Sequence, residues 1–183
     1  MKRILVTGAN KGIGLAIVEN LLQNHPDTFL ILGSRDEKRG DEAVRLLTTK
    51  EPKWADRLMM LAIDVSNDES VTMAAETLAS NFETEAKPLY GIINNAGIGS
   101  SSIGLEPTLQ VNTWGIHRVC EALVPLLEAS GRIVNVTSAA GPNYVEAADD
   151  MTRTMLTDPD VQWDAVEEYM LSLIHISEPT RPY

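Results

Sequence analysis

Three glycines near the N-terminus, Gly8, Gly12 and Gly14, have the type and spacing needed to hold a phosphate group. The apolar run Ile4–Val6 before them predicts a buried strand, and the apolar spacing over 13–22 after them predicts a helix. Glycines lack a Cβ atom, so a pyrophosphate can approach the first helical turn, where unpaired N–H groups favour an anion. This unit predicts a nucleotide site, although such a turn also serves tight packing alone.

The end of the second predicted strand, 28–32, carries residues that can choose between two dinucleotides. A carboxylate there favours NAD through the ribose hydroxyls, and an arginine favours the 2′-phosphate of NADP. Ser34 stands where the carboxylate is expected, Arg35 follows it, and Lys11 can reach the same phosphate from the glycine turn. We therefore predict NADP (NADPH) as cofactor. The carboxylate of Asp36 keeps NAD as a less favoured alternative. Arg35 and Lys11 can also be ordinary charged residues in contact with solvent.

Polar or small residues follow the other predicted strands, at the sheet edge where ligands of parallel α/β folds bind. Asp64 and Val65 follow the strand 57–63, and Ser138 follows the strand 131–136. The strand 89–93 runs into an Asn-Asn-Ala-Gly sequence made up of Asn94, Asn95, Ala96 and Gly97.

Each of these positions also has a purely structural interpretation. Asp64 or Ser66 can cap the helix that begins near Asn67, and Ser138 can serve a turn or a helix cap. Asn112 lies inside a predicted long helix, 108–129, where asparagine is normally a mild defect because its side chain competes with the backbone.

These residues need a framework that brings the strand ends together. Buried-strand patterns alternate with helical patterns along the chain, which predicts an α/β fold with a doubly wound parallel sheet, Rossmann-like, of five strands. The helices expected between the strands span 13–22, 37–49, 71–82 and 108–129. A Gly- and Ser-rich segment, 98–107, is expected to be a loop near the ligand.

Composition narrows the class of protein. A formal net charge of −11 argues against a broad nucleic-acid surface, and no apolar run approaches the ~20 residues of a membrane span. Cys120 is the single cysteine, so no internal disulfide can form. We expect a cytoplasmic protein that binds neither nucleic acid nor membrane, and the sequence leaves its oligomeric state open.

Taken in order, the glycine turn, Ser34-Arg35, Asp64-Val65, the Asn-Asn-Ala-Gly sequence, Asn112 and Ser138 resemble the short-chain dehydrogenase/reductase family, and within it the carbonyl-reductase-like group. The resemblance covers 1–141 and implies strand order 3-2-1-4-5, with hydride transfer between NADP and a small-molecule carbonyl or alcohol. It implies catalytic roles for two residues: Asn112 holds a water of the proton relay, and Ser138 bonds the substrate carbonyl and a catalytic tyrosine. It implies cofactor contacts from Gly8, Asn10, Lys11, Gly12, Ile13, Gly14, Ser34, Arg35, Asp64, Val65, Asn95, Ala96 and Gly97.

The family's catalytic Tyr-x-x-x-Lys pair is absent from this chain. None of the four tyrosines has a lysine four residues later, and no lysine follows Lys87. The acidic segment 141–170 resembles the insert that carbonyl-reductase-like members carry before that pair. We therefore expect this chain to be an inactive fragment of an oxidoreductase, with its C-terminal strands missing. The alternative is a non-catalytic NADP-binding regulatory or scaffold protein.

The last residues differ in character from the rest. Residues 171–181, LSLIHISEPTR, read as a translated transposase-type sequencing adapter. We therefore expect an incomplete NAD(P)-binding Rossmann domain over 1–170 and a non-native tail over 171–183, which should lack a specific docking site.

Overall fold

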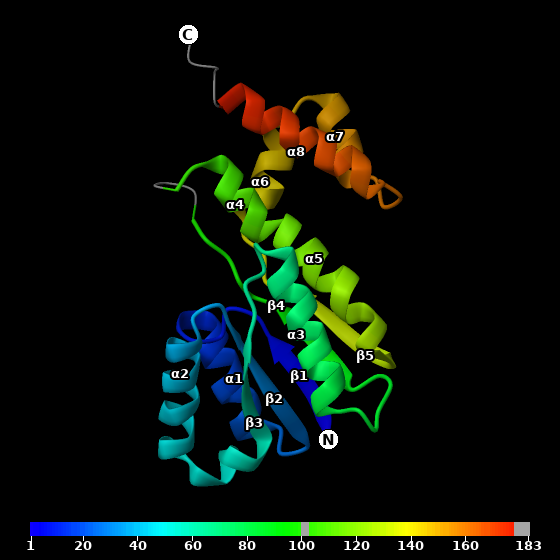
Figure 1. The fold of residues 1–183 in the computed structure, drawn as a ribbon. Coiled ribbons are helices and arrows are strands. Elements are labelled where there is room, and N and C mark those ends of the chain that lie inside the picture. The colour runs from blue at the N-terminus through cyan, green and yellow to red at the C-terminus, as the bar shows by residue number, and fades with distance from the viewer. Residues whose placement is uncertain (100–102, 178–183) are drawn as a thin grey trace.

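The protein is built on one five-stranded parallel sheet. The structure, a computed structural model, describes residues 1–99 and 103–177. The strand order is β3-β2-β1-β4-β5, and every pairing is parallel (Figure 1). The predicted fold class and order are confirmed. The strands are β1 (Lys2–Val6), β2 (Thr28–Ser34), β3 (Leu58–Ala62), β4 (Leu89–Asn94) and β5 (Leu127–Asn135).

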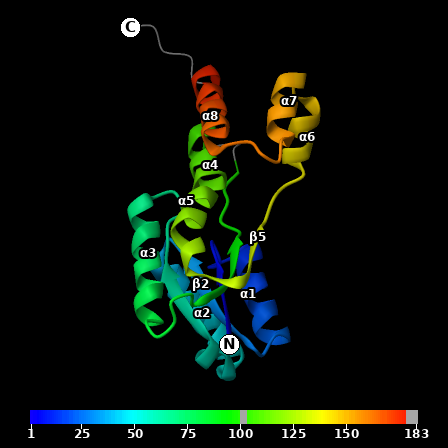
Figure 2. The same ribbon diagram turned by 90° about the vertical axis from the view of Figure 1, so that its right-hand side faces the viewer.

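Helices cover both faces of the sheet and form two cores (Figure 2). On one face, Val18 and Leu22 of α1 (Gly12–Asn24) and Leu47 of α2 (Glu37–Lys50) pack with Leu30 and Leu32. The opposite core contains α3 (Asp68–Asn81) and α5 (Trp114–Leu123), with α4 (Leu105–Asn112) at its upper end. Each fully buried leucine contributes about 1.5–3 kcal/mol through removal from water, so these two apolar layers hold the strand ends in place.

The predicted long helix 108–129 is wrong in its extent. Helical backbone breaks at Thr113 (φ −124°, ψ −64°), and α5 ends at Leu123. A short 3-10 turn, η2 (Val124–Leu126), follows, because Pro125 has no N–H to continue a helix. The residues after it pair with β4, so β5 begins at Leu127, four residues before the predicted start.

The C-terminal part of the described chain is helical. It forms α6 (Ala140–Ala147), α7 (Asp150–Thr157) and α8 (Trp163–Ser177) above the sheet. The indole N–H of Trp114 donates to Glu167 Oε1 at 2.6 Å, and the rings of His117 and Trp163 stack with centroids 3.8 Å apart. These two contacts attach α8 to α5. A second short 3-10 turn, η1 (Pro52–Arg57), precedes β3.

Helix α8 continues without a break across the predicted domain boundary at 170. Met170 is buried, while Leu171 and Ile176 are exposed and Leu173 is half-buried. Residues 178–183 lie outside the described part of the chain, so the non-native origin of 171–183 stays a prediction. No helix among the described residues is long and apolar enough to cross a bilayer.

The glycine turn between β1 and α1 is packed so closely that side chains are excluded at two of its positions, Gly8 and Gly14. A Cβ atom on Gly14 would lie 2.4 Å from Asn95 Nδ2 and 2.6 Å from the Gly8 carbonyl oxygen. At Gly12 a Cβ atom meets no atom within 4 Å, but φ is +57°, a left-handed conformation. Gly14 is therefore required because a side chain has no space there, and Gly12 is required because of its left-handed backbone conformation.

We expect Gly14→Ala to destabilise the protein by about 1–3 kcal/mol, because the new methyl group displaces Asn95 or the turn itself. Gly12→Ala should cost about 1 kcal/mol, the strain of a left-handed alanine alone. Urea unfolding followed by circular dichroism measures both. An equal or larger loss in Gly12→Ala would contradict this account of the turn.

The outer strand β5 leaves apolar side chains in solvent. Ile133 and Val134 of β5, and Val136 directly after it, are 41%, 50% and 40% exposed, and among the described residues β5 pairs only with β4. An apolar outer strand with free backbone groups promotes edge-to-edge association. Within the described structure, β5 is therefore a bare hydrophobic edge of the sheet.

We expect Val134→Lys to reduce self-association while changing the free energy of unfolding by no more than about 0.5 kcal/mol. Sedimentation velocity over a concentration series measures the association. Leu46→Lys is the matched control, since Leu46 is a similarly exposed apolar residue on α2. An equal effect of the control would assign the change to net charge and not to the strand edge.

Candidate cofactor site

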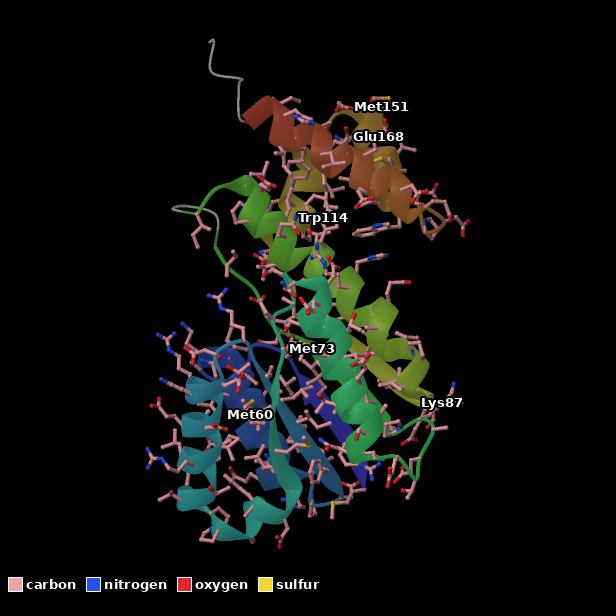
Figure 3. The ribbon with its side chains drawn as sticks, in the orientation of Figure 1. Met60, Met73, Lys87, Trp114, Met151 and Glu168 are labelled. Carbon is pink, nitrogen blue, oxygen red and sulfur yellow. The ribbon has the colours of Figure 1, made fainter. Side chains whose placement is uncertain are left out.

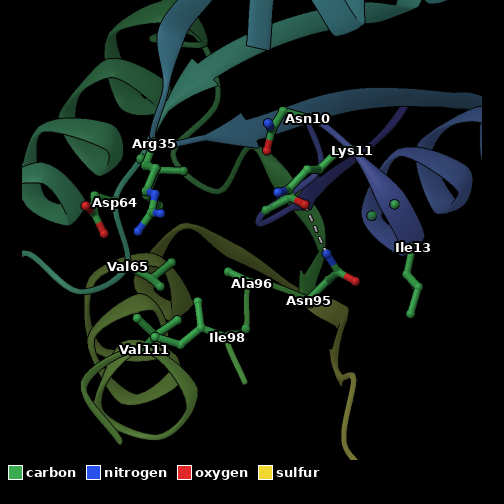
Figure 4. Close-up of a pocket in the computed structure, with 15 residues that line it drawn as sticks. Asn10, Lys11, Ile13, Arg35, Asp64, Val65, Asn95, Ala96, Ile98 and Val111 are labelled. Atoms are coloured by element: carbon green, nitrogen blue, oxygen red, sulfur yellow. Dashed lines mark hydrogen bonds between the residues drawn. The ribbon is translucent and has the colours of Figure 1, made fainter. Parts of the chain in front are cut away.

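A cavity of about 380 Å³ lies where β1, β2, β3 and β4 end (Figure 4). It is lined by every predicted cofactor residue except Ser34. Three apolar residues that sequence analysis missed, Ile63, Ile98 and Val111, complete the lining. The full set is Gly8, Asn10, Lys11, Gly12, Ile13, Gly14, Arg35, Ile63, Asp64, Val65, Asn95, Ala96, Gly97, Ile98 and Val111.

The floor of the cavity is held by bonds between the ends of β1 and β4. The buried Thr7 hydroxyl oxygen accepts from the backbone N–H groups of Asn95 and Ala96, both at 3.0 Å. The Asn95 side-chain amide donates to the carbonyl oxygens of Thr7 and Gly8 at 2.9 and 3.2 Å. Sequence analysis gave Thr7 no role, although its place directly before Gly8 was a signal for it. These bonds fix the glycine turn against the Asn-Asn-Ala-Gly sequence.

Two cations reach the cavity and find no carboxylate partner. Lys11 and Arg35 line it from the first and second strand ends, and neither has an ion pair among the described residues (Figure 4). Asp36 is outside the lining. Its carboxylate caps α2 by accepting from the Arg39 N–H at 3.1 Å and pairs with the Arg39 guanidinium at 3.3 Å. The cavity lining therefore carries two positive charges against the single carboxylate of Asp64.

Ser34 is the one predicted cofactor residue that the structure does not bring into the cavity. It is 1% exposed, and its hydroxyl donates to the Asp36 carbonyl oxygen at 2.8 Å. A Cβ atom on Gly40 of α2 would lie 3.1 Å from the Ser34 Cβ, so the side chain faces α2. The hydroxyl shapes the turn that carries Arg35.

Asp64 combines the two roles considered for it. Its carboxylate lines the cavity, and its Oδ1 accepts from both the N–H and the hydroxyl of Ser66, at 3.0 and 2.6 Å. The cap of α3 is Asn67, which accepts from the Ser70 N–H at 2.8 Å. Helix capping is thus assigned to Asn67, and Asp64 holds the turn at the cavity wall.

Asn112 is the last residue of α4 and lies directly before the break in the helical backbone at Thr113. Its amide donates to the Ile98 carbonyl oxygen and accepts from the Ile98 N–H, both at 2.9 Å. It therefore fastens the segment after β4 to the end of α4, with the neighbouring Val111 in the cavity wall. Binding of a relay water by Asn112 stays a prediction.

Ser138 is exposed and lies outside the cavity lining. Its Oγ accepts from the Ala140 N–H at 3.2 Å, immediately before α6, which is the helix-start role considered as its structural alternative. In the described part of the chain the side chain of Ser138 bonds to Ala140 and that of Asn112 bonds to Ile98, and no hydrogen bond joins these two predicted catalytic residues. The catalytic role of Ser138 stays a prediction.

Tyr144, the first tyrosine after Ser138 in the sequence, is not activated as a proton donor. The hydroxyls of Tyr144 and Tyr169 bond to one another, and this bond raises the pKa of Tyr144 to about 12. A catalytic phenol that exchanges a proton near neutral pH needs a shift in the opposite direction. The Tyr144–Tyr169 pair therefore joins α6 to α8 and does not replace the absent Tyr-x-x-x-Lys pair.

Known proteins share this arrangement. The mitochondrial D-beta-hydroxybutyrate dehydrogenase of Bos taurus is 34% identical over 149 residues, 76% of this chain and 42% of that protein. Carbonyl reductase (NADPH) 1 of Rattus norvegicus is 35% identical over 144 residues, 74% of this chain and 48% of that protein. The solved menthone neomenthol reductase of Mentha piperita superposes with a TM-score of 0.79 at 25% identity, covering 94% of this chain and 72% of that one.

The chain thus spans less than half the length of these two curated relatives. The family model described as short chain dehydrogenase matches residues 2–148, from the first strand to the end of α6, and includes the whole cavity. Sheet order, glycine turn and Asn-Asn-Ala-Gly sequence agree with that match. The chain belongs to the short-chain dehydrogenase family.

Proposed function

We propose that the protein of which these residues are part is an NADP(H)-dependent oxidoreductase acting on a small carbonyl or alcohol substrate. The observation that carries this proposal is the glycine-floored cavity with Lys11 and Arg35 free at one end. Nicotinamide, when bound, supplies the hydride. The chain's own residues bind, orient and neutralise the cofactor.

The cavity fits a dinucleotide on its own geometry. No atom lies within 4 Å of the position that a Cβ atom on Gly12 would take, so a pyrophosphate can approach the N-terminus of α1, where N–H groups and the helix dipole favour an anion. Lys11 and Arg35 would hold the 2′-phosphate through charge-assisted bonds. Asp64 and Val65 would hold the adenine, and Ile98 and Val111 offer an apolar wall to the ring.

Two relatives support the choice of NADP over NAD. One curated relative carries NADPH in its name, and the carbonyl reductase of chicken fatty liver was solved with NADPH bound, at a TM-score of 0.65 and 26% identity. Asp36, the residue that left NAD open, has its carboxylate engaged by Arg39. Together these observations favour a phosphorylated cofactor.

We expect Arg35→Asp to weaken NADP binding about 10–150-fold, which corresponds to the roughly 1.5–3 kcal/mol of a hydrogen bond to a charged group, and to affect NAD far less. Titration calorimetry with each cofactor measures the two dissociation constants. Arg45→Asp is the control, because it makes the same charge change on α2 away from the cavity. If the ratio of the two dissociation constants is unchanged in Arg35→Asp, Arg35 does not bind the 2′-phosphate of the ribose.

The Tyr-x-x-x-Lys pair that would transfer the proton does not occur in this sequence. We propose that Ser138 positions the substrate carbonyl and that a tyrosine and lysine outside these 183 residues supply and tune the proton. General acid–base help is worth 10²–10⁴-fold, so the 183-residue chain should bind NADP with little or no reductase activity.

Reduction of a quinone by this chain with NADPH, followed at the NADPH absorbance band, tests that expectation. Turnover at the rate of an ordinary carbonyl reductase would contradict it. Sequencing the gene beyond the Met170 codon separates the two candidate functions. A Tyr-x-x-x-Lys sequence within roughly 10–30 codons, on a predicted helix, supports the enzyme, and its absence from the whole gene supports the non-catalytic NADP-binding protein.

A further inference from the structure

Strand β3 forms the edge of the sheet opposite to β5, and it has backbone groups that no strand pairs with. Within residues 1–99 and 103–177, β3 pairs only with β2, and the Ile63 N–H donates to the Ser34 carbonyl oxygen at 3.0 Å. Backbone groups alternate in direction along a strand, so those of Met60 and Ala62 point away from β2. The next outward N–H, that of Asp64, donates to Ser70 Oγ at 2.9 Å. Met60 and Ala62 have no such partner in the described part of the chain.

A groove runs along this edge. It encloses about 650 Å³ between the start of α2 and the outer side of α3, and its floor includes Met59, Met60 and Ala62. Met73 and Thr77 of α3 form one wall, and Met73 is 60% exposed. Figure 3 labels Met60 and Met73 at this part of the molecule. Methionine side chains are unbranched and adapt their shape, so the groove can accept side chains of different size.

The charge of the groove has one sign. Its ionisable side chains are the carboxylates Glu37, Asp64 and Glu69, and no lysine or arginine lines it among the described residues. The whole chain carries a net charge of −11. Soluble proteins commonly protect a free edge with lysine, proline or a bulge, but residues 58–62 contain no proline or charged side chain. The β3 edge can therefore pair with an added strand, and the carboxylates around it favour a strand with positively charged side chains.

We propose that the groove along β3 binds an extended, lysine- or arginine-containing peptide segment of another protein as an added strand. Main-chain bonds to Met60 and Ala62 supply affinity, the three methionines contact apolar side chains, and Glu37 and Glu69 pair with the basic ones. This site is separate from the cofactor cavity in function, and it shares only Asp64 with its lining.

A fluorescein-labelled nine-residue peptide of alternating lysine and valine tests the proposal by anisotropy at low ionic strength. We expect saturable binding, and hydrogen exchange should slow at the Met60 and Ala62 amides. The same peptide with its backbone amides N-methylated should lose at least about tenfold in affinity, because it keeps the charge and loses the main-chain donors. A glutamate-for-lysine peptide should not bind.

Substitutions inside and outside the groove test whether the peptide binds along β3. Glu37→Gln combined with Glu69→Gln should weaken binding about 2–20-fold, as for two partly exposed ion pairs, whereas Glu42→Gln on α2 outside the groove should not. Ala62→Pro should abolish binding by removing an outward N–H, with folding checked by circular dichroism. Equal binding of the N-methylated peptide, protection at β5 in place of β3, or no saturable binding would each overturn the proposal.

Discussion

The Thr7–Asn95 interaction is the constraint on which the rest of the structure depends. One buried hydroxyl oxygen accepts from two backbone N–H groups of the β4 end, and one amide returns two bonds to the β1 end. The Asn95 amide occupies the space that a side chain at position 14 would need. The glycine turn, the start of α1 and the loop after β4 are therefore set by a single junction.

That junction lies between β1 and β4, where the order of the sheet reverses direction. The connections that follow β1 and β4 lead away from this point in opposite directions and leave a crevice at the carboxyl ends of the strands. Ligands of open α/β sheets bind in such a crevice. Lys11 comes from one side of the reversal, and Arg35 from the next strand end along. Strand order alone thus brings together cations that are 24 positions apart in the sequence.

Much of the fold and of the cofactor cavity could be predicted from the sequence, because buried parallel strands and glycine turns leave strong local patterns. The long helix was extended too far, since apolar residues at 124–129 fit a helix as well as a strand until Pro125 is considered. Ser34 and Ser138 were predicted to lie in the ligand site because each follows the end of a predicted strand. Sequence position does not determine whether a hydroxyl group faces the ligand or a neighbouring backbone group. In the structure the Ser34 hydroxyl bonds to the Asp36 carbonyl oxygen, and the Ser138 hydroxyl bonds to the Ala140 N–H. Ile63, Ile98 and Val111 were missed because apolar residues look alike in a core and in a cavity wall.

The attachment of α8 has a consequence for how the chain loses structure. The sheet and its two layers of helices share continuous apolar cores. Helix α8 lies outside both cores: it packs against α4, and it is joined to α5 by one indole–carboxylate bond and one pair of stacked rings. Regions held by few buried contacts open at a lower free energy than the core they rest on. We therefore expect α6–α8 to detach as a separate cooperative unit while the sheet remains intact. A single all-or-none transition would not describe the whole chain, and the fluorescence of Trp114 and Trp163 should change before that of the buried Trp54.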